Sequence, residues 1–129
     1  MQDWPDREHY TAEDLVQIIR ILRDPETGCP WDKVQTHASI RKNFLEETCE
    51  ALEAIDADDA DMLREELGDA LFILCKIAQM SGVDPEDALH RACDKYQGRF
   101  RRVADAADRP LNAYTEAEKI ALWEQAKEN

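Results

Sequence analysis

Apolar residues recur every three to four positions along most of this chain, and no stretch shows the sustained alternation that is typical of a β-strand. We expect an all-α fold, built as one domain over residues 1–129, with two long antiparallel helices joined by a short acidic turn. The pattern predicts helices over about residues 12–23, 36–57, 60–80 and 85–106, and a short last helix through Trp123.

Capping residues support these boundaries. The pairs with the spacing of a helix start are Thr11 with Asp14, Asp84 with Pro85, and Thr115 with Glu118. Gly82 stands where the third helix should end. Between the first two helices, residues 24–35 contain prolines and a glycine, so we expect an irregular segment there.

The charge balance excludes several classes of partner. The chain has 16 Lys and Arg residues against 29 Asp and Glu residues, a net charge of −13. Such a chain lacks the basic surface that binds a nucleic-acid polymer or an anionic membrane. No apolar run approaches the ~20 residues of a membrane span, and the first residues lack the pattern of a signal peptide. We therefore expect a cytoplasmic protein.

The cysteines indicate neither zinc binding nor a disulfide framework. The chain has 4 cysteines, and no two have the C-x-x-C spacing of a zinc knuckle. Because nothing indicates export, we interpret them as ordinary thiols, mostly within helices.

Glu66 is an anomaly in the third predicted helix. It projects from within a broad apolar arc, near Ile73 and Ile77. An unpaired carboxylate in such surroundings costs several kcal/mol, so it is normally paired, protonated or bound to a metal. No Lys or Arg lies three or four residues away to pair with it. Gly68 is a second anomaly, because a mid-helix glycine costs ~1 kcal/mol relative to alanine unless a ligand or another helix comes close.

The acidic residues of the two long helices have a spacing that favours a metal site. Residues 46–50 read EExxE and residues 66–69 read ExxD. Side chains three residues apart share a helix face, so Glu47 and Glu50 can lie opposite Glu66 and Asp69 across an antiparallel pair. Oxygen donors without histidine or thiolate suit Mg²⁺ or Mn²⁺. The alternative for Glu46, Glu50 and Glu53 is a solvated helix face.

The fourth predicted helix carries basic residues in one sector, beside an apolar arc. Residues 91–102 contain five basic residues and one acid, a net charge of +4. The residues of this sector are Arg91, Lys95, Arg99 and Arg102. Basic side chains also suit a helix C-terminus and cover apolar edges. Next to a magnesium site, however, they favour phosphate binding and metal-assisted attack on a phosphoanhydride. A di-iron bundle would instead need Glu-x-x-His on two helices, which this chain lacks.

These motifs resemble those of the MazG family of nucleoside triphosphate pyrophosphohydrolases. The resemblance covers roughly residues 12–127. It rests on GCPWDKxQTH at residues 28–37, EExxE followed by ELGD at residues 46–50 and 66–69, DKYxxRFxxV at residues 94–103, and WEQAK at residues 123–127. The chain departs from the family pattern at Cys93, where Asn is frequent, and at Ala104, where an acid is common.

The resemblance implies an all-α fold whose helices pair, usually across a homodimer, into a four-helix bundle. It implies hydrolysis of an NTP or dNTP between the α and β phosphates, in a role of nucleotide-pool house-cleaning. Glu47, Glu50, Glu66 and Asp69 would hold Mg²⁺, with Mn²⁺ as the alternative ion. Glu46 would be a further catalytic acid that positions water. The substrate would be bound by Trp31, near the base, and by Lys95 and Arg99 at the triphosphate.

Two alternatives stay open at this point. One is a non-catalytic acidic helical bundle that engages a basic partner. The other is a specialised relative that acts on dCTP, dUTP or phosphoribosyl-ATP. The residues near the base decide nothing between a broad and a narrow substrate range.

Overall fold

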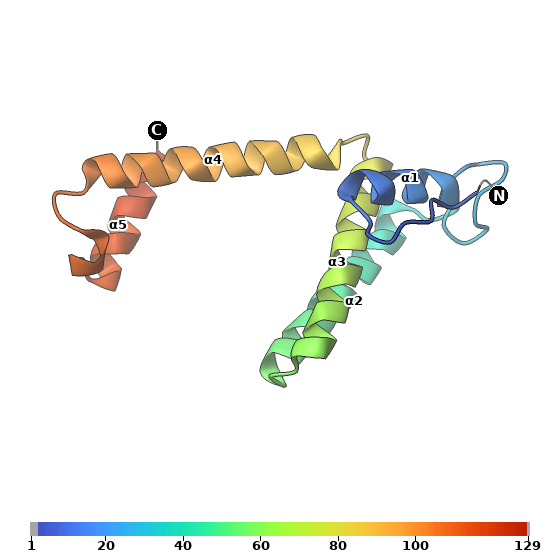
Figure 1. Cartoon of the computed structure of the whole chain (residues 1–129), viewed down its shortest axis with the longest axis horizontal. Coiled ribbons are helices and arrows are strands. Elements are labelled where there is room, and N and C mark those ends of the chain that lie inside the picture. Colours follow the sequence, from blue (N-terminus) through green and yellow to red (C-terminus); the bar gives the residue numbers. More distant parts are fainter. Residues whose placement is uncertain (1–2, 129) are drawn as a thin grey trace. The chain divides into compact units, whose positions relative to one another are not determined.

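The computed structural model describes residues 3–128, and within them the chain is helical with no strand, as predicted (Figure 1). The elements are α1 (Ala12–Leu22), α2 (His37–Asp56), α3 (Ala60–Met80), α4 (Pro85–Ala106), the 3-10 helix η1 (Leu111–Ala113) and α5 (Glu116–Lys127). In the part of the chain described, no helix is both long enough and apolar enough to cross a membrane.

The capping boxes predicted at Thr11 and Thr115 are both present. A third one, which the sequence analysis missed, joins Thr36 to Ser39 at the start of α2, with serine in the place usually taken by Glu or Gln. The last helix continues to Lys127, so its predicted end at Trp123 was too early.

The described residues divide into two compact units between Pro85 and Glu86, and each is described by itself. The prediction of a single domain stays a prediction. In the first unit, α2 and α3 lie side by side and antiparallel, and α1 packs on α3 near the end opposite their connecting turn (Figure 1). The small core contains Ile18, Ile19 and Ile21 of α1, with Ile40 and Ala54 of α2.

Within the first unit, much of the apolar surface of the α2–α3 hairpin is left uncovered. Six leucine and isoleucine side chains on these helices are between 47% and 64% exposed. They are Leu45, Leu52 and Ile55 on α2, and Leu67, Leu71 and Leu74 on α3. A contiguous face of this kind is typical of a surface that binds another molecule.

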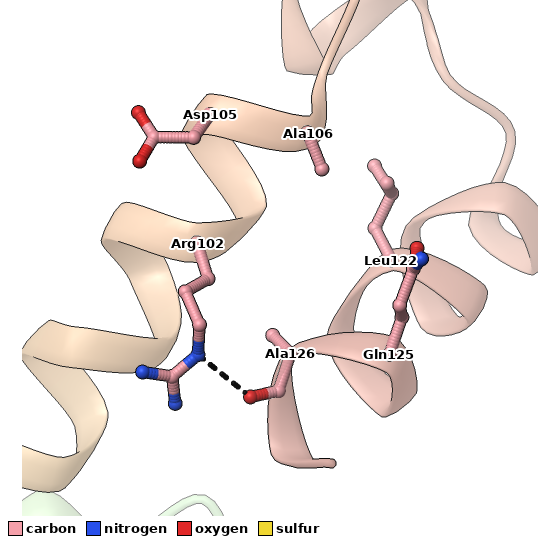
Figure 2. A pocket seen from close by; sticks show the side chains of 6 residues that line it. All are labelled: Arg102, Asp105, Ala106, Leu122, Gln125 and Ala126. Atoms are coloured by element: carbon pink, nitrogen blue, oxygen red, sulfur yellow. Dashed lines mark hydrogen bonds between the residues drawn. The ribbon is translucent and has the colours of Figure 1, made fainter. Parts of the chain in front are cut away.

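In the second unit, α5 turns back against the C-terminal half of α4. The Trp123 ring stacks on Tyr96, with centroids 5.9 Å apart, and contacts Phe100 at 5.1 Å. Arg102 Nε donates a hydrogen bond to the Ala126 carbonyl at 2.9 Å (Figure 2). This contact borders a pocket of about 270 Å³ between the two helices. Because Arg102 caps the last turn of α5, we interpret its role as structural.

Candidate metal centre

The two long helices bring carboxylates together at the middle of the hairpin. Glu47 comes from α2, and Glu66 and Asp69 come from adjacent turns of α3. One carboxylate oxygen from each of the three lies within 4.8 Å of the others. The spacing of three residues places Glu66 and Asp69 on one face of α3, and the antiparallel packing turns Glu47 toward them.

Glu50 lies next to this group, whereas Glu46 does not join it. Glu50 lies close enough to Glu47 and Glu66 for its carboxyl to raise the pKa of both, through hydrogen bonding and charge. Glu46 is 56% exposed and faces Lys42, with Nζ and Oε1 3.9 Å apart. We call Glu47, Glu50, Glu66 and Asp69 the acid cluster. The structure thus brings together three of the four predicted metal ligands, Glu47, Glu66 and Asp69. Glu50 lies beside them with an exposed side chain, so its place as a ligand stays a prediction, and Glu46 lies at their margin.

Burial and neighbouring carboxylates raise the pKa of two residues of the acid cluster, Glu66 and Glu47. Desolvation, followed by the hydrogen bond and the repulsion from Glu50, raises the pKa of Glu66 to about 7. The pKa of Glu47 is also raised, by desolvation and then by the charges of Glu50 and Asp69. Glu66 is therefore only partly ionised near neutral pH, and a nearby cation would lower its pKa again.

Two oxygens of the acid cluster lack any hydrogen-bond partner. Glu47 Oε2 and Glu66 Oε2 are buried and accept no hydrogen bond. Buried acceptors are normally satisfied, because an unsatisfied one loses its bonds to water without replacement. The atoms that could ligate a metal here are all carboxylate oxygens, and hard divalent cations prefer oxygen ligands. The acid cluster therefore fits a Mg²⁺ or Mn²⁺ ion.

Two of the four basic residues in the sector of α4 have partners within the second unit. Arg91 Nε pairs with Asp87 at 2.8 Å, and Arg102 binds the Ala126 carbonyl. Within residues 3–128, Lys95 and Arg99 have no ion pair with an acid. The Lys95 ammonium lies 5.1 Å from the centre of the Tyr96 ring, and the Arg99 guanidinium lies 5.7 Å from it. Two of the four basic residues therefore keep their donors available for an anion.

Of two tryptophans near candidate ligand-binding residues, the sequence analysis gave a role to Trp31 and none to Trp123. Trp31, predicted to lie near the base, is on the 24–35 loop and is 82% exposed. The sequence analysis gave Trp123 no role beyond the closing helix, yet the Arg99 guanidinium lies 5.8 Å from its ring. Aromatic ring faces can hold cations in this way. Only the tertiary pairing of α4 with α5 reveals this contact.

Gly68 stands beside the acid cluster in open space. A β-carbon built there would meet no neighbouring atom within 4 Å. Within the first unit, neither α1 nor α2 therefore approaches this glycine closely. The expectation that a ligand or another helix packs against Gly68 stays a prediction.

Comparison with known proteins identifies close relatives. A family model described as the MazG nucleotide pyrophosphohydrolase domain matches residues 35–104. A nucleoside triphosphate pyrophosphohydrolase of Escherichia coli is 42% identical over 113 residues, covering 88% of this chain and 43% of that protein. The nucleoside triphosphate pyrophosphohydrolase/pyrophosphatase MazG of Thermotoga maritima is 38% identical over 119 residues, covering 89% of this chain and 46% of that protein.

A third relative, the nucleoside triphosphate pyrophosphohydrolase of Mycolicibacterium smegmatis, is 35% identical over 130 residues, covering 93% of this chain and 37% of that protein. The chain spans less than half the length of these relatives. No solved structure matches it significantly.

Proposed function

The chain belongs to the family of MazG nucleotide pyrophosphohydrolase domains, and on this premise we propose that it hydrolyses nucleoside triphosphates to a monophosphate and pyrophosphate. The observation that carries the proposal is the acid cluster, with its two buried oxygens that lack a partner. The names of these relatives describe this activity in those proteins.

Mg²⁺ is the proposed cofactor, held by Glu47, Glu50, Glu66 and Asp69. When bound, such an ion polarises a phosphate and lowers the pKa of a water ligand. The carboxylates supply the negative charge that makes the site selective for a divalent cation. Glu46, exposed at the margin of the acid cluster, is proposed to orient the attacking water.

Lys95 and Arg99 are proposed to bind the triphosphate. Their donors are not engaged by acids in the described chain, and the rings of Tyr96 and Trp123 limit the motion of Arg99. Charged donors directed at phosphate oxygens stabilise the negative charge of phosphoryl transfer. Trp31 is proposed to stack on the base, which an exposed aromatic can do for any base. A role in removing unwanted nucleotides would follow from such a tolerant contact.

A homodimer is part of the proposal. The exposed leucines and isoleucine of the α2–α3 hairpin form an apolar face that a second copy could cover. Gly68 lies on the same hairpin, with open space where its side chain would be. Pairing two such hairpins would complete a four-helix bundle.

Release of pyrophosphate from a panel of NTPs and dNTPs, with and without Mg²⁺, tests the function directly. Glu66→Gln should lower the rate at least about 100-fold, because it removes a charged ligand from the acid cluster. The matched control is Glu65→Gln, at the neighbouring exposed position, which should keep the wild-type rate. An unchanged rate in Glu66→Gln would refute the mechanism. Absence of product with every base, without a metal-dependent rise in Tm, would favour the non-catalytic interaction module.

A further inference from the structure

The 24–35 loop has little backbone freedom. The amide of Cys29 donates to the Leu22 carbonyl at 2.8 Å, and the amide of Gly28 donates to the Asp24 carbonyl at 2.9 Å. A β-carbon at Gly28 would lie 2.4 Å from the Asp24 carbonyl oxygen, so only glycine fits there. The Lys33 amide closes the loop further, by donating to the Cys29 carbonyl at 3.0 Å. The loop therefore has a defined conformation before any ligand arrives.

A buried ion pair ties this loop to α3. The Lys76 ammonium binds the Asp32 carboxylate, and the two side chains are 10% and 18% exposed. Lys76 is the one charged residue that is buried among the described residues. Its ammonium also lies 5.4 Å from the centre of the Phe72 ring. Arg23 strengthens the attachment by donating to the Asp32 carbonyl at 2.5 Å.

Lys76 and the acid cluster share one rigid element. Lys76 follows Asp69 by seven residues on α3, which is about two turns, so the two side chains leave nearly the same face about 10 Å apart along the axis. The helix therefore fixes the separation between the acid cluster and the anchored loop.

Trp31 immediately precedes the anchored Asp32. Its ring is 82% exposed, although the backbone on both sides is fixed. A buried ion pair is a poor source of stability compared with apolar residues, but it can specify geometry. An exposed aromatic held on a fixed backbone loses little conformational entropy when it binds a flat ligand.

We propose that the Asp32–Lys76 ion pair is a positioning device that holds Trp31 at a set distance from the acid cluster, so that the loop receives the nucleoside end of the substrate. The inference rests on the proposed function. Neither Asp32 nor Lys76 contacts the substrate; both act through Trp31. The pair consequently governs substrate binding rather than the chemical step.

Steady-state kinetics with dNTPs and Mg²⁺ test this role through Lys76→Met, which keeps the apolar stem and removes the charge. KM should rise about tenfold, the scale of one lost base–aromatic contact, with kcat within about twofold. Lys76→Arg, which retains the ion pair, should restore most of the loss. The matched control is Lys119→Met, which removes an exposed ion pair with Glu116 and should leave KM unchanged.

Two further readouts separate positioning from general destabilisation. Hydrogen exchange of Lys76→Met should be faster at the amides of Cys29, Lys33 and Gln35, with α2 and α3 unaffected. Binding of Mn²⁺ alone should keep its wild-type affinity. In the double variant Trp31→Ala with Lys76→Met, the increases in KM should not multiply, because both changes remove the same contact.

The outcomes discriminate between the two proposals. If Lys76→Met has the kcat and the KM of the wild type, this inference is overturned and the proposed function is not. The same follows if the increases in KM multiply in the double variant. A parallel loss of kcat, Mn²⁺ affinity and helix protection also overturns it, because the pair would then support only the fold. A wild-type protein that releases no pyrophosphate overturns the proposed function, and this inference with it.

Discussion

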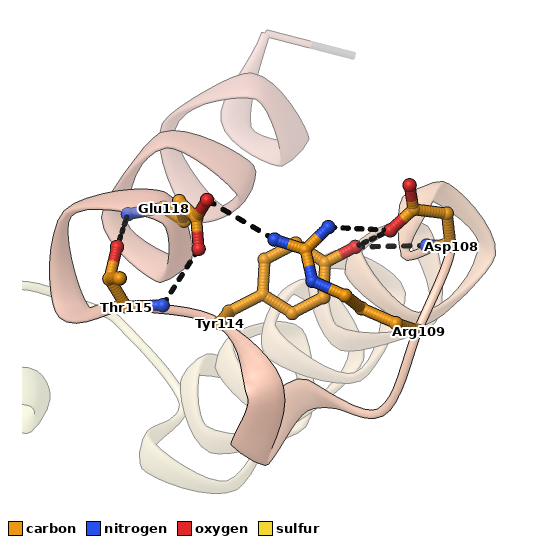
Figure 3. A network of polar contacts seen from close by, with 5 residues as sticks. All are labelled: Asp108, Arg109, Tyr114, Thr115 and Glu118. Carbon is orange, nitrogen blue, oxygen red and sulfur yellow. Dashed lines mark hydrogen bonds and ion pairs between the residues drawn. The ribbon is translucent and has the colours of Figure 1, made fainter.

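The carboxylates of the acid cluster differ in their bonding partners from those where α4 is joined to α5. We call residues 107–118, which include the first turn of α5, the α4–α5 connection. In the connection, Asp108 accepts hydrogen bonds from the Tyr114 hydroxyl at 2.7 Å and from Arg109 at 2.9 Å (Figure 3). Glu118 accepts from the Thr115 amide at 2.8 Å and pairs with Arg109 at 3.1 Å. In the acid cluster, the neighbours of each carboxylate are other carboxylates, and two oxygens have no partner.

The pKa values of the carboxylates shift in opposite directions in the two regions. The bond from Tyr114 is the largest cause that lowers the pKa of Asp108, and the Thr115 amide is the largest that lowers the pKa of Glu118. The pKa of Glu66, by contrast, is raised to about 7. Acids of the first kind stabilise the fold by being ionised, whereas those of the second kind are held ready for a cation.

The largest expected difference between the two regions is in activity, tested with the same substitution in each. Asp69→Asn should lower pyrophosphate release about 100-fold or more, because the acid cluster loses a charged ligand. Asp108→Asn should keep the rate within about twofold and lower the Tm instead, because it weakens only the connection. Turnover and thermal melts of both variants measure this, and equal losses of activity would contradict it.

The next expected difference concerns pH and metal. Because folding raises the pKa of Glu66 from 4.5 to about 7, the folded state binds more protons than the unfolded state between these values. The free energy of unfolding contributed by this group therefore falls as the pH rises through that window. In EDTA, Glu66→Gln should gain Tm relative to wild type from pH 4.5 to pH 7, and the gap should then level off.

Saturating Mg²⁺ should close that gap at pH 7.5, by stabilising the wild type more than Glu66→Gln. Thermal melts across pH, with and without Mg²⁺, provide the measurement. Glu65→Gln serves as the control and should follow the wild type throughout. A gap that stays constant with pH would show that Glu66 is not the titrating group.

A smaller difference separates two glycines inside helices. At Gly68, beside the acid cluster, a β-carbon meets nothing, and at Gly98 on α4 it meets only the tip of Arg102 at 3.5 Å. Gly→Ala at either position should stabilise the monomer by about 0.5–1 kcal/mol through helix propensity. If a second copy packs on the α2–α3 hairpin, Gly68→Ala alone should weaken the dimer. Sedimentation together with chemical unfolding checks this, and intact dimers in Gly68→Ala would exclude close packing at Gly68.

Local patterns account for most of what the sequence predicted. The proximity of Glu47, Glu66 and Asp69 could be predicted, because the three-residue spacing and the short turn after α2 fix their positions within neighbouring segments. The Asp32–Lys76 pair joins residues 44 positions apart, and no local pattern identifies such a partner. The position of Lys76 at the border of the apolar arc of α3, on the same side as Asp69, was the one available indication. The contact of Arg102 with the Ala126 carbonyl could not be predicted either, because it depends on how α5 packs on α4.

The smallest expected effect tests whether the α4–α5 connection depends on geometry or on charge alone. Arg109 contacts both Asp108 and Glu118, and its guanidinium stacks 3.9 Å from the centre of the Tyr114 ring. Arg109→Lys keeps the charge but loses the planar, two-sided contact, so the Tm at pH 7 should fall slightly, by less than Gly68→Ala raises it. The lowered pKa values of Asp108 and Glu118 place their stabilising effect above about 4. The difference between Arg109→Lys and wild type should therefore vanish as acid protonates both groups, and a difference that persists at pH 2 would assign the role of Arg109 to stacking on Tyr114.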